Sequence, residues 1–234
     1  MQSHPGTHRG FTLIELLVAI SVMALMSVLS WRGLDGMTRA QAQTQQHANQ
    51  VLTLQTGLAQ WAADLDALVQ GPQINSLDWD GRVLRMTRRS TASDAEGLLV
   101  VAWSRRNING TGQWLRWQSP ALRSRADMQE AWQKAALWGQ NPGDEEKKRE
   151  VTIGPLTQWQ IYYFRGDAWS NPLSSDTSAA AAAVAPGANA ATAPLVNATV
   201  PEGVRLVLTL PAGQALSGTL TRDWVRPTVG GGKS

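Results

Sequence analysis

Few residues of the chain have types and spacings that could support catalysis. The sequence contains three histidines and no cysteine, so thiolate nucleophiles, disulfides and cysteine-bound metals are excluded. His47 lies in a polar stretch, where a solvated helix face explains it better than a general base. No G-x-S-x-G or H-E-x-x-H motif occurs, and the sequence GGGKS has Pro227 where a phosphate-binding loop needs its first glycine. These observations argue against an enzyme, including a membrane-anchored hydrolase.

Two pairs of aspartates could be imagined as calcium ligands. They are Asp64 with Asp66 and Asp78 with Asp80. Neither pair supplies the number of oxygen ligands that calcium requires. We therefore expect all four to be surface charges of a helix and of a hairpin, and we expect no metal or cofactor.

The basic and aromatic residues give little support to nucleic-acid binding. The formal net charge is +3, whereas a single-strand site needs a basic groove with exposed aromatic rings. The adjacent arginine pairs at 88–89 and 105–106 are explained by an exposed strand edge. Of the 11 tryptophans, Trp103, Trp114 and Trp117 fall in strand-like segments, where core packing is the default.

Glu15 is a carboxylate inside an apolar stretch that runs from Phe11 to Trp31. As a helix this stretch would be about 30 Å long, which matches the hydrocarbon core of a bilayer. A charge near the centre of such a core costs about 2.5 kcal/mol or more, and less near the interface. The stretch therefore predicts a transmembrane helix in which Glu15 needs either water or a partner.

Residues 1–10 have no apolar core and end in Gly10, directly before the apolar stretch. An ordinary secretory signal instead places its cleavage site after the apolar stretch. The segment RGFTLIELLVAI resembles the start of type IV prepilins and type II secretion pseudopilins. The resemblance implies that prepilin peptidase cuts between Gly10 and Phe11, that the new Phe11 amine is N-methylated, and that Glu15 becomes the fifth residue of the mature chain.

The resemblance also implies a role for Glu15 in subunit assembly. In this family the subunits leave the bilayer and stack their helices into a fibre. A buried carboxylate in such a bundle needs a cationic partner, which would be the Phe11 amine of a neighbouring subunit. Because only one stagger brings these groups together, the pair can set the axial register between subunits.

A helical pattern of apolar residues resumes after a polar stretch with Gly33 and Gly36, where we expect a flexible point. Gly71, followed by Pro72, is expected to end the pattern. We predict one long N-terminal helix, embedded in the membrane over its first half and packed on a soluble domain over its second. The apolar positions of that second half are Val51, Leu54, Leu58, Trp61, Leu65 and Leu68.

The rest of the chain alternates in the manner of antiparallel strands. One hairpin is predicted around Asp80 and Gly81 in the segment LDWDGRVLRMTR. A second hairpin is predicted from the segments GLLVVAWSR and QWLRWQS. Further strands are expected in TQWQIYYFR, GVRLVLTL and QALSGTLTRDW. Ser124 with Asp127 predicts a capping box that begins a helix, which Gly139 closes. The segment NPGDEEKKRE is expected to be a charged loop.

The patterns and the resemblance together predict an α+β, pilin-like fold, with a long N-terminal helix packed on an antiparallel β-sheet domain. The expected parts are a leader peptide at 1–10, a transmembrane and assembly helix at 11–31, its periplasmic continuation at 32–71, a β-rich globular domain at 72–229 with an Ala-rich low-complexity loop at 174–194, and a tail at 230–234.

Later segments narrow the resemblance. Four segments are similar to parts of the J-type minor pseudopilin of type II secretion. They are WRGLDGM, IYYFRGDAW, GVRLVLTL and LTRDWVRP. This resemblance implies a non-enzymatic tip subunit of the periplasmic pseudopilus, anchored in the bacterial inner membrane with its domain in the periplasm. It implies as partners the I- and K-type minor pseudopilins, prepilin peptidase and exported proteins. The alternatives are a minor pilin of a type IV pilus and a pseudopilin of competence DNA uptake.

Overall fold

The computed structural model describes residues 10–71, 74–90, 97–174 and 200–227. Three expected segments lie outside these residues: the leader apart from Gly10, the Ala-rich loop apart from Ser174, and the tail. The chain divides into two units, residues 1–49 and 50–234, and each is described by itself.

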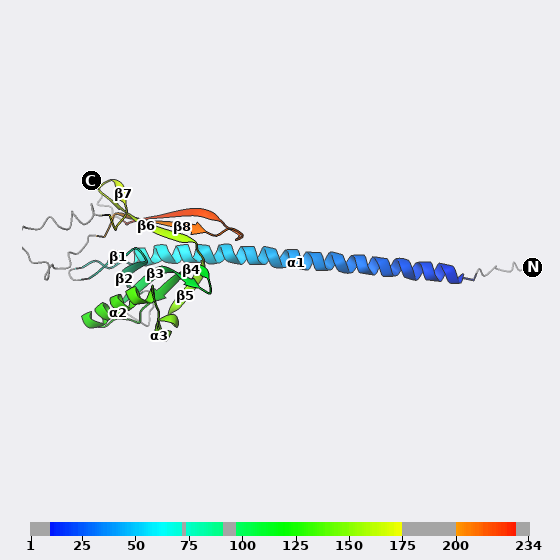
Figure 1. The fold of residues 1–234 in the computed structure, drawn as a ribbon, viewed down its shortest axis with the longest axis horizontal. Helices are drawn as coiled ribbons and strands as arrows, with labels where there is room; N and C mark the ends of the chain where they lie inside the picture. The colour runs from blue at the N-terminus through cyan, green and yellow to red at the C-terminus, as the bar shows by residue number, and fades with distance from the viewer. Residues whose placement is uncertain (1–9, 72–73, 91–96, 175–199, 228–234) are drawn as a thin grey trace, which may run out of the picture. The chain divides into compact units, whose positions relative to one another are not determined.

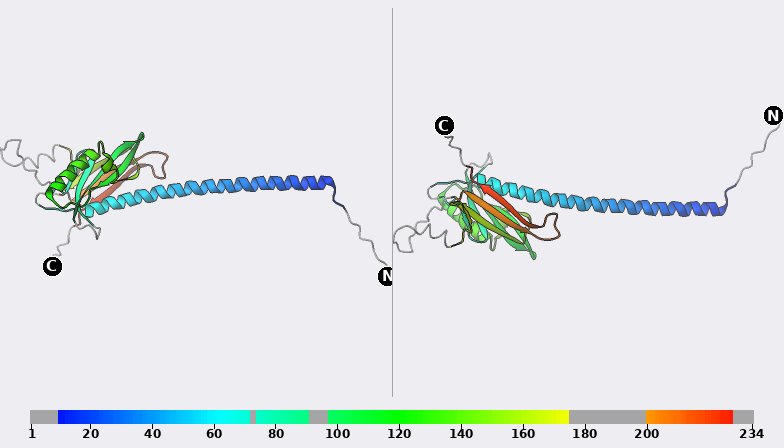
Figure 2. Two further views of the ribbon diagram at one scale, coloured as in Figure 1. Left: turned by 90° about the horizontal axis from the view of Figure 1, so that it is seen from below. Right: turned by 90° about the horizontal axis from the view of Figure 1, so that it is seen from above.

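Helix α1 runs from Leu13 to Asp66 and has 54 residues. Figures 1 and 2 show it as an unbroken ribbon. Gly33 and Gly36 lie inside it, and a Cβ added at either would meet no other atom within 4 Å. The flexible point expected at these glycines does not interrupt the helix, because its regular hydrogen bonding continues through both.

Five strands form an antiparallel sheet in the order β1-β2-β3-β4-β5. They are β1 (Leu77–Trp79), β2 (Val83–Arg89), β3 (Leu98–Ile108), β4 (Thr111–Gln118) and β5 (Glu150–Pro155). Both predicted hairpins are confirmed, since β1 pairs with β2 and β3 with β4. Gly81, Asn109 and Gly110 have φ values of 90°, 50° and 80°, the positive values that tight hairpin turns require.

The end of α1 departs from the prediction. The helix stops at Asp66, whereas the sequence predicts a stop at Gly71. Leu68 instead forms an antiparallel bridge with Arg88 of β2, and the backbone on both sides of Leu68 hydrogen-bonds to the same strand. The prediction was wrong at this boundary because the chain exchanges helical hydrogen bonds for pairing with a strand that lies far along the sequence.

A second antiparallel sheet has the order β7-β6-β8-β9. Its strands are β6 (Gln158–Arg165), β7 (Ala168–Ser170), β8 (Gly203–Leu210) and β9 (Gly218–Val225). The three predicted strand regions are confirmed, although β9 begins at Gly218 rather than at Gln214. Gly166 and Asp167 form the turn between β6 and β7 with φ values of 55° and 70°.

Two short helices lie between β4 and β5. Helix α2 (Arg125–Trp138) begins with the predicted capping box of Ser124 and Asp127, and Gly139 closes it. The Ser124 side-chain hydrogen bond lowers the pKa of Asp127 below its usual range. The charged-loop prediction for the next segment was wrong, because it forms α3 (Asp144–Lys147) and the start of β5. Acidic residues in the first turn favour α3 by interaction with its helix dipole.

Two clusters of buried side chains hold residues 50–234 together. In the first, the C-terminal part of α1 packs between the two sheets, with Trp61 and Leu65 fully buried. Figure 1 shows this cyan part of α1 between the strands of both sheets. In the second, Trp132 and Trp138 of α2 cover the other face of the first sheet. The predicted apolar stripe and the pilin-like α+β arrangement are thus confirmed.

The approach of α1 to the first sheet is close at Gly57. A Cβ at this position would lie 2.4 Å from Ile153 Cγ2 of β5 and 3.3 Å from Trp114 Cζ3 of β4. No side chain fits at these distances without displacing its neighbours. Glycine therefore lets the helix backbone lie directly on the strands, although nothing in the sequence pattern marks this position.

Candidate functional site

The predicted processing site lies before the first turn of α1. Gly10 and Phe11 precede Leu13, the first residue of the helix, and both are exposed. Phe11 is 89% exposed. The peptide bond between Gly10 and Phe11 therefore lies in accessible, non-helical backbone.

Thr12 and Glu15 form a reciprocal capping box at this helix start. The Thr12 backbone N–H donates to Glu15 Oε2 at 3.1 Å, and the Glu15 N–H donates to Thr12 Oγ1 at 3.4 Å. The Thr12 hydroxyl also donates to Glu15 Oε2, at 2.9 Å. These bonds satisfy backbone donors that a helix start leaves unpaired, and they place a carboxylate at the positive end of the helix dipole.

This local role of Glu15 is missing from the sequence predictions. The signal was present, because the T-x-x-E spacing of Thr12 and Glu15 is the same capping signature that predicts the start of α2. Glu15 is thus an exposed carboxylate that accepts hydrogen bonds within its own subunit. Carboxylate oxygens can accept several donors, so these bonds leave capacity for a cation from another molecule.

Hydroxyl groups in the apolar part of α1 are hydrogen-bonded inside the helix. Ser21 Oγ donates to Leu17 O at 2.8 Å, and Ser27 Oγ donates to Met23 O at 2.8 Å. Each hydroxyl therefore has an acceptor without water. This internal pairing is what a helix surrounded by hydrocarbon requires.

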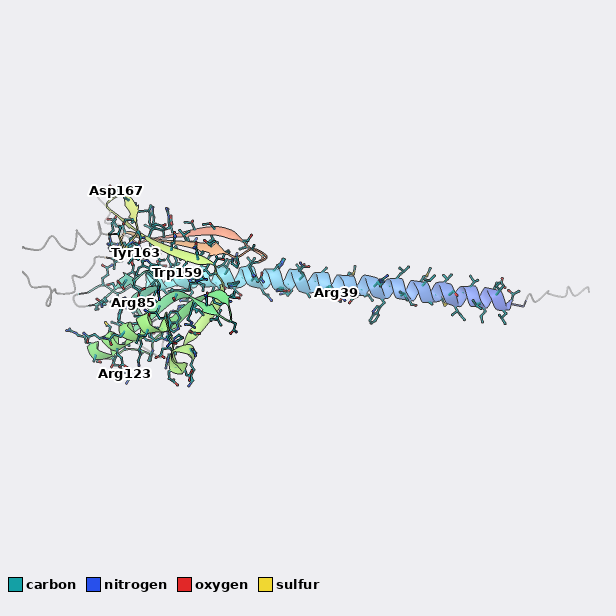
Figure 3. All side chains as sticks on the ribbon, viewed as in Figure 1. Arg39, Arg85, Arg123, Trp159, Tyr163 and Asp167 are labelled. Carbon is teal, nitrogen blue, oxygen red and sulfur yellow. The ribbon has the colours of Figure 1, made fainter. Side chains whose placement is uncertain are left out.

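The large apolar side chains at the start of α1 are exposed, as Leu13 (80%), Leu17 (59%) and Leu29 (66%) illustrate. The helix is long and apolar enough to cross a membrane. Beyond this stretch, Arg39 pairs with Asp35 at 3.0 Å on the helix surface, and Figure 3 labels Arg39. An apolar surface of this extent fits a bilayer or the helices of other subunits.

Asp64 is fully buried, which contradicts its predicted position on the surface. It accepts hydrogen bonds from Arg116 Nε at 2.8 Å and from Arg116 Nη2 at 2.9 Å. Trp103 Nε1 donates to it at 3.0 Å, Gln60 Nε2 at 2.8 Å, and Arg88 Nη1 also donates. Because a buried carboxylate is costly unless it is paired, these donors explain how Asp64 is accommodated in the core.

The Asp64 cluster joins α1 to three strands of the first sheet. Apart from Gln60 of α1 itself, its donors come from β2, β3 and β4, so a single carboxylate connects the helix to all three strands. The surrounding N–H groups occupy the oxygens that a calcium ion would need. In the sequence Asp64 directly precedes Leu65, so it borders the apolar face of the helix, but its donors lie on distant strands that helical periodicity does not reveal.

The other three aspartates that were considered as calcium ligands also have hydrogen-bond or ion-pair partners. Asp66 Oδ1 accepts from Trp224 Nε1 of β9 at 2.7 Å. Asp78 pairs with Arg85 across the β1–β2 hairpin, and Asp80 accepts from the backbone N–H groups of the hairpin turn. The prediction of hairpin charges is confirmed for this second pair. No group of three metal-ligating side chains was found among the described residues.

The other candidate residues are structural or solvated. His47 is exposed on α1, as expected. Trp103, Trp114 and Trp117 are buried in the core, as predicted. Arg88 is only 5% exposed, so the expectation of an exposed strand edge was wrong there. Its guanidinium belongs to the Asp64 cluster.

Comparison with known families gives one match. Residues 6–31 match the model described as the prokaryotic N-terminal methylation motif. No curated protein matches the chain. The matched residues include the start of α1 with Gly10, Phe11 and Glu15.

The motif is that of the type IV pilin and pseudopilin superfamily. Together with a long apolar helix packed on antiparallel sheets, it identifies a prepilin-like protein of a type IV pilus or a type II secretion pseudopilus. The motif implies processing by prepilin peptidase and assembly into a pilus-like fibre. It points to a structural, non-enzymatic protein whose apolar helix fits an inner-membrane anchor.

Proposed function

We propose that this chain is a J-type minor pseudopilin of type II secretion, a non-enzymatic tip component that helps to initiate the periplasmic pseudopilus. Its soluble domain lies in the periplasm, and its partners are the I- and K-type minor pseudopilins. The fibre supports export of folded proteins across the outer membrane, and exported proteins contact its tip.

The observation that carries this proposal is that three of the four segments similar to the J-type subunit lie in the second sheet. IYYFRGDAW covers parts of β6 and β7, GVRLVLTL is β8, and LTRDWVRP covers most of β9. These strands are neighbours in one sheet, where β6 and β9 both pair with β8. The similar segments therefore form one structural unit, which supports a shared surface rather than scattered coincidences.

The proposal includes processing at the start of α1. Prepilin peptidase cuts between Gly10 and Phe11, and the Phe11 amine is then methylated. Glu15 pairs with the Phe11 amine of a neighbouring subunit and sets the axial register. The exposed, non-helical backbone at Gly10 supports cleavage there, and the exposed Glu15 carboxylate supports a contact between subunits.

A minor pilin of a type IV pilus and a competence pseudopilin share the same N-terminal motif, so partner choice is the test. A photo-crosslinking amino acid is placed at exposed positions of β9, such as Thr221, in the full-length membrane protein. We expect crosslinks to co-expressed I- and K-type pseudopilins and loss of secretion when the gene is deleted. Crosslinks to pilus minor pilins instead, with normal secretion in the deletion strain, would show that the chain belongs to a pilus.

A further inference from the structure

A cleft of about 450 Å³ lies in the second unit, at one end of the first sheet. Its walls come from the turn before β2, the end of β3, the residues after α2 and the start of β6. Three arginines line it, together with polar side chains and Trp159. The cleft is separate from the start of α1 and takes no part in the function proposed above.

The cleft exists because β3 is longer than β2. The last pair between these strands is Val83 with Ser104, whereas β3 continues to pair with β4 as far as Ile108. Residues 105–108 therefore pair with β4 on one side. On the other side, β2 has no residue that pairs with them. No described residue pairs with this length of strand edge, and an open strand edge can accept the backbone of an extended peptide.

The charge of the cleft is positive. Arg106 is neutralised, because its Nη2 donates to both Glu150 carboxylate oxygens at 2.7 and 2.8 Å. Arg105 instead donates from Nε to the carbonyl of Leu156 at 2.9 Å, and none of the residues that the structure describes forms an ion pair with it. Arg82 is exposed, and no described residue forms a hydrogen bond or ion pair with its guanidinium.

The other lining residues complete a site for a carboxylate on an extended chain. None of the described residues that line the cleft is acidic. Side-chain amides from both walls can pair with peptide groups. Trp159 offers an aromatic face and is held by an edge contact with Trp79, with ring centroids 4.8 Å apart; Figure 3 labels Trp159. The amides are those of Asn107, Gln140, Gln158 and Gln160.

We infer that this cleft binds an extended acidic segment of another protein. A glutamate or aspartate of that segment pairs with Arg82 and Arg105, and its backbone lies along the free edge of β3. Charge complementarity selects the acidic partner, and the amides accommodate its peptide groups. The inference holds whether the fibre is a pilus or a pseudopilus.

Binding is measured with the full chain in detergent micelles and a fluorescein-labelled peptide in which glutamate alternates with threonine. The same peptide with glutamine in place of glutamate is the ligand control. We expect the glutamate peptide to bind more tightly than the glutamine peptide. We also expect its affinity to fall as salt rises, because exposed charges are screened.

Two substitutions on exposed lining residues test the site. Arg82→Gln removes the guanidinium that has no partner among the described residues. Binding should weaken about tenfold, the loss expected for one charge-assisted hydrogen bond. Gln158→Glu adds a like charge and should weaken binding at least as much. The matched controls, Arg222→Gln on β9 and Gln133→Glu on α2, are exposed outside the cleft and should leave the affinity within about twofold.

The outcomes are distinct. Equal binding of the glutamate and glutamine peptides, or unchanged affinity in both cleft variants while thermal melts show that they remain folded, would overturn the inference. If a single-stranded oligonucleotide bound more tightly than the glutamate peptide and its binding also depended on Arg82, the ligand of the cleft would be a nucleic acid and not a peptide. A failure of crosslinking to the I- and K-type partners would leave this result untouched, since the peptide assay needs neither partner.

Discussion

Two carboxylates of α1 show how differently one residue type is used in this protein. Glu15 lies at an exposed helix start and accepts hydrogen bonds from Thr12. Asp64 lies fully buried near the other end of the same helix and is surrounded by donors from the first sheet. Water or another subunit can reach the first, whereas the second is committed to the core of its own domain.

Replacement of Asp64 should strongly destabilise the second unit. Asp64→Asn removes the buried carboxylate charge that pairs with Arg88 and Arg116, and the loss of one member of a buried ion pair typically costs about 3–5 kcal/mol. The free energy of unfolding, followed by tryptophan fluorescence in urea, measures the loss. The matched control is Asp223→Asn, which breaks a partly exposed pair with Arg205 and should cost less than about 1 kcal/mol. Equal effects of the two variants would contradict a central role for the Asp64 cluster.

Replacement of Glu15 should separate helix capping from assembly. Glu15→Gln keeps a side chain that can complete the capping box but removes the charge, whereas Thr12→Val breaks the box and keeps the charge. We expect the Gln variant to insert into the membrane normally and to dock more weakly, because it lacks the charge that would pair with the neighbouring Phe11 amine. Crosslinking between neighbouring helices measures docking.

The Thr12→Val variant is the control for that experiment and should still crosslink, because its carboxylate can pair with the neighbouring Phe11 amine. Normal crosslinking of Glu15→Gln together with loss in Thr12→Val would show that capping, and not charge pairing, is what assembly requires.

At the scale of elements, the fold depends on how closely α1 lies on the first sheet. Trp61 and Leu65 pack into the core between the sheets, and Gly57 removes the side chain where β5 approaches. Trp224 of β9 donates to Asp66, which ties the second sheet to the end of the same helix. One helix segment therefore organises both sheets.

A side chain at Gly57 should separate the helix from β5. Gly57→Ala improves helix propensity by about 1 kcal/mol, but overpacking typically costs about 1–3 kcal/mol. Because the colliding atom is a methyl group of the β-branched Ile153, we expect a net loss of about 1 kcal/mol in the free energy of unfolding. Gly36→Ala, which meets no atom within 4 Å, should be neutral or stabilising.

A double variant tests the cause of that loss. Ile153→Ala removes the colliding methyl group, so Gly57→Ala should cost less in the Ile153→Ala background than in the natural sequence. An identical cost in both backgrounds would exclude the contact with Ile153 as the reason for glycine at this position.

At the scale of the whole molecule, the chain combines an apolar helix surface with a domain that has its own core. The first part of α1 exposes leucine, isoleucine and valine side chains, whereas the core of the second unit is closed by two sheets and α2. This division is what a protein needs if it is first held in a membrane and later packed by its helix into a fibre.

Processing should therefore produce one defined mature terminus. Mass spectrometry of the membrane-extracted protein should show a chain that begins with N-methylated Phe11 when prepilin peptidase is active. A strain without the peptidase, or the variant Gly10→Val, should retain residues 1–10. An unprocessed terminus in cells with active peptidase would contradict the assignment of the cleavage site.

Local features of this protein follow from its sequence alone. The helix, the two hairpins and the capping box of α2 depend on neighbouring residues, so periodicity and turn residues such as Asp80 and Gly81 predict them. The methylation motif is likewise one continuous stretch. These elements predict the α+β class and the candidate site at Gly10, Phe11 and Glu15.

Tertiary structure alone decided the features that depend on distant residues. Asp64 is buried because Arg88 and Arg116, 24 and 52 positions away, supply its donors. Helix α1 ends at Asp66 because the following residues pair with β2, and the cationic cleft exists because β3 extends past β2. Sequence patterns describe neighbours along the chain, whereas the burial of a charge and the length of a free strand edge depend on contacts that form only when the chain folds.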